Sequence, residues 1–509
     1  MALTTLLLAS ALSPLAAQTS TAGTELPTLF TATSQAPAPG VGLSTPAKRQ
    51  RVVTVDLRLL QRLARAPESA DSLALNLFDD RTLVADFSSL EAAPNNGWIW
   101  KGDFEGDDGG VTISVVQTAV SATVQYGEEL YRIAPAGDGI HWIVDAPADH
   151  GLECGMGEEH EVTSPVGLGG SSGGAARGTG LNDIDTLVVY STAAKNVSGG
   201  TSGMQSKINL AVTETNDAYN FSGVDHRLVL VHTEEMIGYN EPSSFSQILS
   251  DLSSTNDGDM DNVHQLRDQY GADVVAMICQ NGQYCGIAYL MTNVSPNFAS
   301  SAFSVTNYSC ATGYYSFGHE IGHNMGSNHD PQNASSGAYS YSFGFRTSNN
   351  QYRTIMAYSP GTRIKRFSSP NVTYNGFVMG DNNQDNARSM NNASDTIADW
   401  RPTVPDSPTL TVLALISGFS TSASLEECTP NGAVVLALST AGDGPTTTIY
   451  GVADLSPPII QLPSVTVDAN GDGSVPLSIP GGTSGTTVWF QALDLGSGEF
   501  SNGQQQTIL

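Results

Sequence analysis

Three of the chain's nine histidines, His319, His323 and His329, fall within eleven residues. Residues four apart lie on one face of a helix, so His319 and His323 can present two imidazole nitrogens to one metal ion. Gly326 stands where that helix has to end, because glycine adopts the left-handed conformation that turns the chain and brings His329 back as a third ligand. Three imidazoles leave a fourth position for water, whose pKa a zinc ion lowers towards about 7. The spacing therefore predicts a catalytic zinc site.

Glu320 directly follows the first of these histidines and can act on water without being a metal ligand. A carboxylate there accepts a proton from the water as its oxygen attacks a peptide carbonyl, then delivers the proton to the leaving amine. The alternative, a helix with unrelated histidines, applies to any bare His-Glu-x-x-His, but the glycine and the third histidine argue against it.

Three imidazoles also suit other divalent ions, of which zinc is usually the most available. Calcium is not ruled out, but no carboxylate cluster has diagnostic calcium spacing. The sequence thus predicts a zinc endopeptidase.

The extended motif resembles that of the metzincin superfamily of zinc peptidases, whose members carry a methionine turn further along the chain. Thr354-Ile355-Met356-Ala357-Tyr358 matches that turn. The resemblance implies that Met356 lies beneath the three imidazoles, the alternative being an ordinary core methionine. It also implies that Tyr358 ligates zinc or stabilises the oxyanion, as in astacin-like and serralysin-like members. Asp330, directly after the third histidine, resembles reprolysin-like members instead.

The residues just before the zinc motif are similar to bacterial peptidyl-Asp metalloendopeptidases. The similarity is carried by 308–313 (Tyr-Ser-Cys-Ala-Thr-Gly) and 316–318 (Ser-Phe-Gly), and extends more loosely over about residues 181 to 402. It implies cleavage before Asp. Basic residues crowd the two sides of the methionine turn. In metzincins this turn forms a wall of the pocket for the residue after the scissile bond. The basic residues could therefore pair with an acidic side chain of the substrate. They are Arg346, Arg353, Arg363, Lys365 and Arg366. The alternative is a basic strip that balances an acidic surface.

The five cysteines cannot all pair within one chain. Cys285 and Cys310 lie in the family-like stretch and could close a disulfide that braces the approach to the zinc helix. Cys154 resembles the cysteine switch of metzincin prosegments, which implies that its thiolate fills the fourth zinc position and keeps the enzyme latent. The alternative for Cys154 is an unpaired structural cysteine. For Cys279 and Cys428 the sequence assigns no partner, and either could be a buried thiol.

The elements that must position these residues follow an α/β pattern. Strand-like runs at 186–190, 227–232 and 273–279 alternate with a helical window at 203–219. The metzincin resemblance implies that 181–402 is a catalytic domain with a mixed sheet and the zinc helix. The predicted fold class is therefore multidomain, with β-rich parts on both sides of an α/β (α+β) catalytic domain.

The N-terminal part is predicted to be removed in two steps. The apolar run Leu6–Leu12, followed by small residues, predicts a signal peptide over 1–17 and hence a secreted, extracellular protein, although no Lys or Arg precedes Lys48. Residues 18–178 are predicted to form an inhibitory prosegment, β-rich from 52 to 150. The Gly/Ser-rich linker at 164–180 is the kind of segment where proteolysis concentrates.

The C-terminal residues 409–509 have the short Val/Leu/Thr runs and Gly/Pro turns of a β-sandwich. Within it, 468–473 imitates the start of a calcium loop, but Ile479 stands where the loop needs a glutamate, which favours a turn. The net charge of −29 excludes nucleic acid as a partner and disfavours anionic lipid surfaces. Proteins or peptides are the expected substrates. The alternative function is a secreted protein whose C-terminal sandwich binds a surface or polymer and carries the main role.

Overall fold

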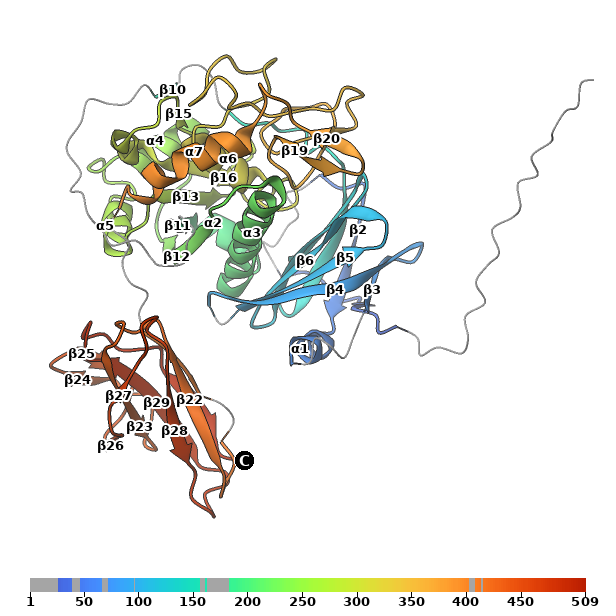
Figure 1. Cartoon of the computed structure of the whole chain (residues 1–509). Coiled ribbons are helices and arrows are strands. Elements are labelled where there is room, and N and C mark those ends of the chain that lie inside the picture. Colours follow the sequence, from blue (N-terminus) through green and yellow to red (C-terminus); the bar gives the residue numbers. More distant parts are fainter. Residues whose placement is uncertain are drawn as a thin grey trace, which may run out of the picture. The chain divides into compact units, whose positions relative to one another are not determined.

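The computed structural model describes residues 26–38, 46–65, 72–95, 97–155, 161–162, 183–401, 408–412 and 415–509. The predicted signal peptide and the predicted linker at 164–180 lie outside these residues. The chain divides into two compact units, of which the smaller consists mainly of Arg401–Leu509 (Figure 1). No helix among the described residues is long and apolar enough to cross a membrane.

The N-terminal part of the larger unit is one antiparallel sheet of nine strands, in the order β1-β2-β9-β8-β7-β6-β5-β4-β3. We call it the N-terminal sheet. Its strands are β1 (Phe30–Ala32), β2 (Arg49–Val55), β3 (Ser72–Phe78), β4 (Arg81–Ala93), β5 (Gly97–Phe104), β6 (Asp107–Val116), β7 (Ala119–Tyr126), β8 (Glu129–Pro135) and β9 (Ile140–Ala146). One helix, α1 (Leu57–Arg65), lies between β2 and β3 in the chain. The β-rich pattern read from 52 to 150 therefore corresponds to a single large sheet.

The two faces of the N-terminal sheet differ in polarity. Along β6, Val111, Ile113 and Val115 enter an apolar core on one face. The residues between them, Thr112 and Ser114, are buried as well but point to the other face, as strand alternation requires. That polar face contacts helix α3 (Thr201–Ser222) through β6 and β7 (Figure 1).

The second part of the larger unit is built on a mixed five-stranded sheet with the order β12-β11-β13-β16-β14. Its strands are β11 (Ile184–Ser191), β12 (Leu228–Met236), β13 (Val274–Cys279), β14 (Gly286–Ala288) and β16 (Phe303–Asn307). All pairs are parallel except β14, which runs antiparallel to β16 at the sheet edge. Every residue of β11 and β13 is buried, which explains why these strands read as continuous apolar runs.

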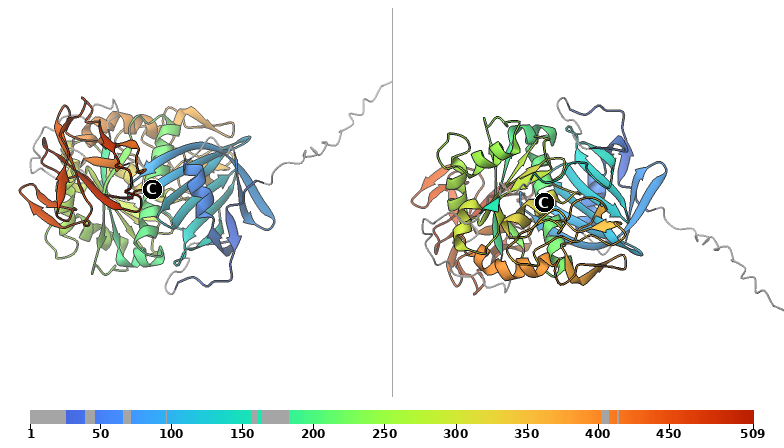
Figure 2. Two further views of the ribbon diagram at one scale, coloured as in Figure 1. Left: turned by 90° about the horizontal axis from the view of Figure 1, so that it is seen from below. Right: turned by 90° about the horizontal axis from the view of Figure 1, so that it is seen from above.

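Helices pack on this sheet and carry the site. Residues of α3, α6 (Ser316–Asn324) and α7 (Asn386–Ala398) share one apolar core with β11 and β13. Figure 2 shows this α/β part, green to orange, beside the blue N-terminal sheet. The remaining helices are α2 (Thr192–Val197), α4 (Phe245–Ser253), α5 (Asn262–Gln269) and the 3-10 helix η3 (Pro296–Ser301). Short strand pairs complete the unit: β10 (Glu161–Val162) with β15 (Leu290–Met291), β17 (Tyr352–Arg353) with β18 (Thr362–Arg363), and β19 (Ser369–Tyr374) with β20 (Phe377–Met379).

Residues 408–412 and 415–509, the described C-terminal residues of the smaller unit, form strands and connecting turns without a helix. Two sheets, ordered β21-β22-β28 and β26-β23-β29-β30, bury one shared apolar core that includes Leu425, Leu436 and Phe490. The strands are β21 (Thr409–Val412), β22 (Ser420–Glu426), β23 (Ala433–Ser439), β24 (Thr446–Thr448), β25 (Gly451–Ala453), β26 (Ile459–Gln461), β27 (Val465–Thr466), β28 (Gly473–Ser478), β29 (Thr487–Asp494) and β30 (Gln504–Thr507). Residues 468–473, whose sequence imitates the start of a calcium loop, connect β27 to β28, and Asp468 accepts hydrogen bonds there from the backbone of Asn470 and Asp472.

Candidate metal centre and peptide-binding cleft

Helix α6 is completely buried, and its glycines make that packing feasible. A Cβ on Gly322 would meet the Met356 Sδ at 2.7 Å, and one on Gly318 would meet the Thr215 Oγ1 at 2.8 Å. The helix ends as the sequence predicts: Gly326 has φ of +84° and its N–H donates to the His323 carbonyl at 3.0 Å. The turn at Gly326 directs the chain back towards the helix face that carries the first two histidines.

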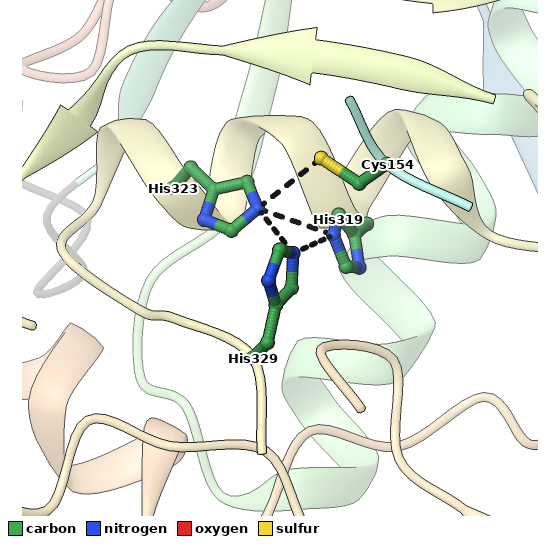
Figure 3. A group of neighbouring side chains, drawn as sticks. All are labelled: Cys154, His319, His323 and His329. Carbon is green, nitrogen blue, oxygen red and sulfur yellow. Dashed lines mark hydrogen bonds between the residues drawn. The ribbon is translucent and has the colours of Figure 1, made fainter. Parts of the chain in front are cut away.

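The structure brings the three histidines together. Their Nε2 atoms lie 3.1 Å (His319 to His323), 3.1 Å (His323 to His329) and 3.2 Å (His319 to His329) apart (Figure 3). The Nδ1 atom of His319 faces the Ile355 carbonyl at 2.8 Å, and that of His323 faces the Ser327 carbonyl at 2.9 Å. A carbonyl partner requires the proton on Nδ1, which leaves the Nε2 lone pair directed at the centre of the group.

This group of donors fits a zinc ion. Tetrahedral zinc with ordinary Zn–N bonds separates its nitrogen ligands by about 3.3 Å, close to the distances between these three imidazoles. The Sγ of Cys154 lies 3.6 Å from the His323 Nε2, where a fourth ligand of the same tetrahedron is expected (Figure 3). Burial lowers the pKa of His323 to about 3 and the pKa of His319 and His329 well below the usual value, which keeps all three imidazoles neutral. Neutral imidazoles are the form that binds a metal.

Glu320 lies beside this group and is fully buried. Its Oε2 accepts a hydrogen bond from the Cys154 thiol at 3.3 Å, and its Oε1 has no hydrogen-bond partner among the described residues. Burial raises the pKa of Glu320 to about 8, despite the opposing effects of Cys154 and Arg363. A Cβ on Gly286 would collide with the Glu320 side chain, so only glycine fits at this point of β14. Gly286 was not predicted from the sequence. The one feature that could have indicated it is the position of a glycine inside a short strand next to Cys285.

Of the methionine-turn residues, Tyr358 contacts His329 directly, whereas Met356 packs against helix α6. Met356 packs beneath α6, with its sulfur against Gly322. The Tyr358 ring lies on the His329 ring at a centroid distance of 4.0 Å, and its hydroxyl donates to the Cys154 carbonyl at 2.8 Å. Burial raises the pKa of Tyr358 well above its usual value, so the phenol is protonated and able to donate.

The five basic residues nominated for a specificity pocket fall into two groups: Arg346, Arg353 and Arg363 are neighbours in the backbone pairing around β17, whereas Lys365 and Arg366 contact α3. Arg346 binds Asp330 at 2.6 Å, and Asp330 in turn accepts from the Tyr358 N–H at 3.1 Å. Lys365 pairs with Asp217 of α3, and the Arg366 guanidinium lies over the Phe221 ring. Only Arg353 and Arg363 face the segment that carries Cys154, and both contact Glu153.

Residues 149–155, which we call the cysteine segment, run along β14. The Gly155 N–H donates to the Gly286 carbonyl at 2.8 Å, and the Cys285 N–H donates to the Glu153 carbonyl at 3.0 Å. Further along the chain, β10 pairs in parallel with β15. The predicted disulfide joins Cys285 to Cys310 and ties the start of β14 to the loop before α6. Cys279 and Cys428 are buried and belong to no disulfide among the described residues.

Comparisons with known proteins identify the family. The family model Reprolysin_5 (Metallo-peptidase family M12) matches residues 181–368. A peptidyl-Asp metalloendopeptidase of Stenotrophomonas maltophilia (strain K279a) is 33% identical over 388 residues, covering 70% of this chain and 90% of its own. A peptidyl-Asp metalloendopeptidase of Xanthomonas campestris pv. campestris is 33% identical over 375 residues, covering 68% of this chain and 86% of its own. The chain is therefore a metalloendopeptidase and belongs to the family of the peptidyl-Asp metalloendopeptidases.

Proposed function

We propose that this chain is a secreted zinc endopeptidase that uses Glu320 as its general base and is produced in a latent form. The observation that carries the proposal is the meeting of three imidazole Nε2 atoms within 3.2 Å of one another, with the Glu320 carboxylate beside them. Secretion is supported by the apolar run at Leu6–Leu12.

His319, His323 and His329 would hold the metal, and Cys154 would be its fourth ligand in the latent chain. A zinc ion held there supplies Lewis-acid chemistry, because it makes water more acidic and polarises a peptide carbonyl. Glu320 then takes a proton from the attacking water and passes it to the leaving amine. The unpartnered Oε1 of Glu320 is available for that proton.

The substrate main chain would lie along β14 and be oriented by Tyr358. Support comes from the cysteine segment, whose backbone already pairs with Cys285 and Gly286 and whose carbonyl at Cys154 accepts from the Tyr358 hydroxyl. An extended peptide adding to a sheet edge is a common recognition mode. A Tyr358 hydroxyl aimed at a carbonyl would stabilise negative charge as it develops on that oxygen.

Residues 18–178 would be the prosegment. The cysteine segment occupies the same groups that the reaction needs: Glu320, Tyr358 and the edge of β14. Removing it by cleavage in the Gly/Ser-rich linker would therefore open the cleft. Cleavage before Asp is proposed because these relatives are peptidyl-Asp metalloendopeptidases.

The test is casein hydrolysis by the full chain before and after proteolytic trimming, with and without a zinc chelator. We expect strong hydrolysis only after trimming, its loss with the chelator and its return with added zinc. One mole of zinc per mole of trimmed protein should accompany the activity. A trimmed protein that binds no stoichiometric metal, or whose hydrolysis ignores the chelator, would overturn the proposal.

A further inference from the structure

Two guanidinium groups lie buried together next to the metal centre. Arg353 is 2% exposed and Arg363 is 7% exposed, and the two come from the paired strands β17 and β18. Arg353 is fixed by the carbonyls of Gly361 and Ala357, and Arg363 by the carbonyl of Tyr314. Two buried cations at one place are unfavourable unless an anion compensates them. The pair therefore has the character of an anion site.

The anion that compensates them is the carboxylate of Glu153. Its oxygens lie 3.3 Å from the Arg353 Nη1 and 3.3 Å from the Arg363 Nη2, and the Ser359 N–H donates to it at 3.0 Å. Asp149 adds a longer contact to Arg353 at 3.6 Å. Among the described residues, the carboxylates that form ion pairs with these two arginines all come from the cysteine segment.

Glu153 also stands at a defined place relative to the reaction. It directly precedes Cys154, whose sulfur lies with the imidazoles and whose carbonyl accepts from Tyr358. Its own carbonyl accepts from the Cys285 N–H at the edge of β14. The arginine pair thus receives a side chain one residue away from the residue at the metal centre. A substrate residue next to the scissile bond would occupy a comparable position.

We propose that Arg353, Arg363 and the Ser359 N–H form the pocket that selects an acidic residue beside the scissile bond, and that Glu153 fills this same pocket in the uncut chain. Glu153 then keeps the uncut chain latent together with Cys154. This inference rests on the proposed function and names the selective residues of that site. Once the cysteine segment leaves, two buried positive charges lose their counter-ion, so the pocket favours a carboxylate over a neutral amide of the same shape.

The first experiment measures selectivity. Full-length Arg353→Gln, Arg363→Gln and the exposed control Arg388→Gln are trimmed, and kcat/KM is measured for two peptides that differ only in Asp or Asn after the cleaved bond. Each pocket variant should lower the Asp-to-Asn ratio by about tenfold or more, while the control keeps the ratio of the parent. Arg353→Lys and Arg363→Lys, which retain the charge and are less disruptive, should lower the ratio by a smaller factor.

The second experiment measures latency and does not depend on how the arginine variants fold. Untrimmed Glu153→Gln should hydrolyse the Asp peptide about tenfold faster than the untrimmed parent, because a neutral amide compensates the arginines poorly. Glu153→Asp should retain most of the latency, and Glu128→Gln, in an exposed turn of the N-terminal sheet, should retain all of it.

The outcomes separate this inference from the function it rests on. An unchanged Asp-to-Asn ratio in both arginine variants, or a Glu153→Gln chain as latent as the parent, overturns the shared pocket while hydrolysis by the trimmed parent upholds the peptidase. A zinc-loaded, trimmed parent that hydrolyses neither peptide overturns the proposed function and the pocket together.

Discussion

The N-terminal part, residues 26–155, contacts the α/β part of the larger unit, which carries the three histidines, in regions of different character. Between the N-terminal sheet and α3 the contacts are spread out and polar: the Ser121 N–H donates to Ser206 at 3.0 Å, and Asp217 binds both Lys101 and Lys365. Around the three histidines the contacts come from the cysteine segment, and they include the Cys154 thiol on Glu320 and the Tyr358 hydroxyl on the Cys154 carbonyl. On the proposed function, the contact with α3 would hold the N-terminal part in place, whereas the cysteine segment would block the reaction.

The polarity of the face beside α3 fits the proposal that this interface separates. An apolar patch, in which Leu130, Val144 and Ala146 pack with Tyr314, also joins the two parts. The opposite face of the same sheet is apolar, with residues such as Leu73, Leu75 and Trp100 fully buried in its own core. Exposing that apolar face would cost far more than exposing serines and charged groups that water can solvate. The difference between the two faces indicates which surface would be released if the linker is cut as proposed.

The largest expected effect tests whether Glu320 is the general base. Glu320→Gln should reduce kcat of the trimmed enzyme by about a thousandfold, because the amide cannot take the proton from water. Zinc content should be unchanged, since Glu320 is not among the proposed ligands. Steady-state kinetics and metal analysis of the same preparation check this; hydrolysis at the parent rate would contradict a general base at this position.

The next effect concerns Cys154, the proposed fourth metal ligand of the latent chain. Cys154→Ala in the full chain should raise hydrolysis before trimming by about tenfold or more, because the fourth metal position then becomes accessible to water. Trimmed Cys154→Ala should match the trimmed parent, which serves as the control. If the untrimmed variant is as inactive as the parent, Cys154 is a structural cysteine and the block lies elsewhere.

A smaller effect is expected at the contact between the N-terminal sheet and α3. Lys101→Met removes one partner of Asp217, a buried ion pair that joins the two parts. We expect the N-terminal fragment to dissociate about tenfold more readily after the linker is cut, as measured by the dissociation constant of the cut complex. Activity after complete removal of the fragment should equal that of the parent, because Lys101 belongs to the removed part.

The smallest effect is a pH dependence of the same contact. Burial alone would raise the pKa of Asp217, but the charges of Lys365 and Lys101 outweigh it and lower that pKa. A carboxylate with a lowered folded pKa stabilises the fold fully above its unfolded pKa of about 3.9 and loses that contribution as the pH falls through the folded value. The cut complex should therefore weaken below about pH 4. Asp217→Asn should make it weaker at neutral pH and flatten the acid response; an equally steep response in that variant would assign it to other groups.

Much of the metal centre could be predicted because it depends on local geometry. The four-residue spacing of His319 and His323 and the turn at Gly326 are properties of one helix and its end. The helix predicted at 203–219 is α3, and the strands predicted at 186–190, 227–232 and 273–279 are β11, β12 and β13. Short runs rich in β-branched and apolar residues are typical of such strands.

What the tertiary structure decided is the grouping of residues that are distant in the chain. The sequence nominated five basic residues as one pocket, yet Arg353 and Arg363 bind the cysteine segment, Arg346 binds Asp330 beside them, and Lys365 and Arg366 contact α3. Glu153 and Gly286 carried no motif of their own and gained their places only when the cysteine segment paired with β14. A helix fixes neighbours through its own backbone geometry, whereas contacts across about 130 or 200 residues depend on how whole sheets dock, which no local pattern encodes.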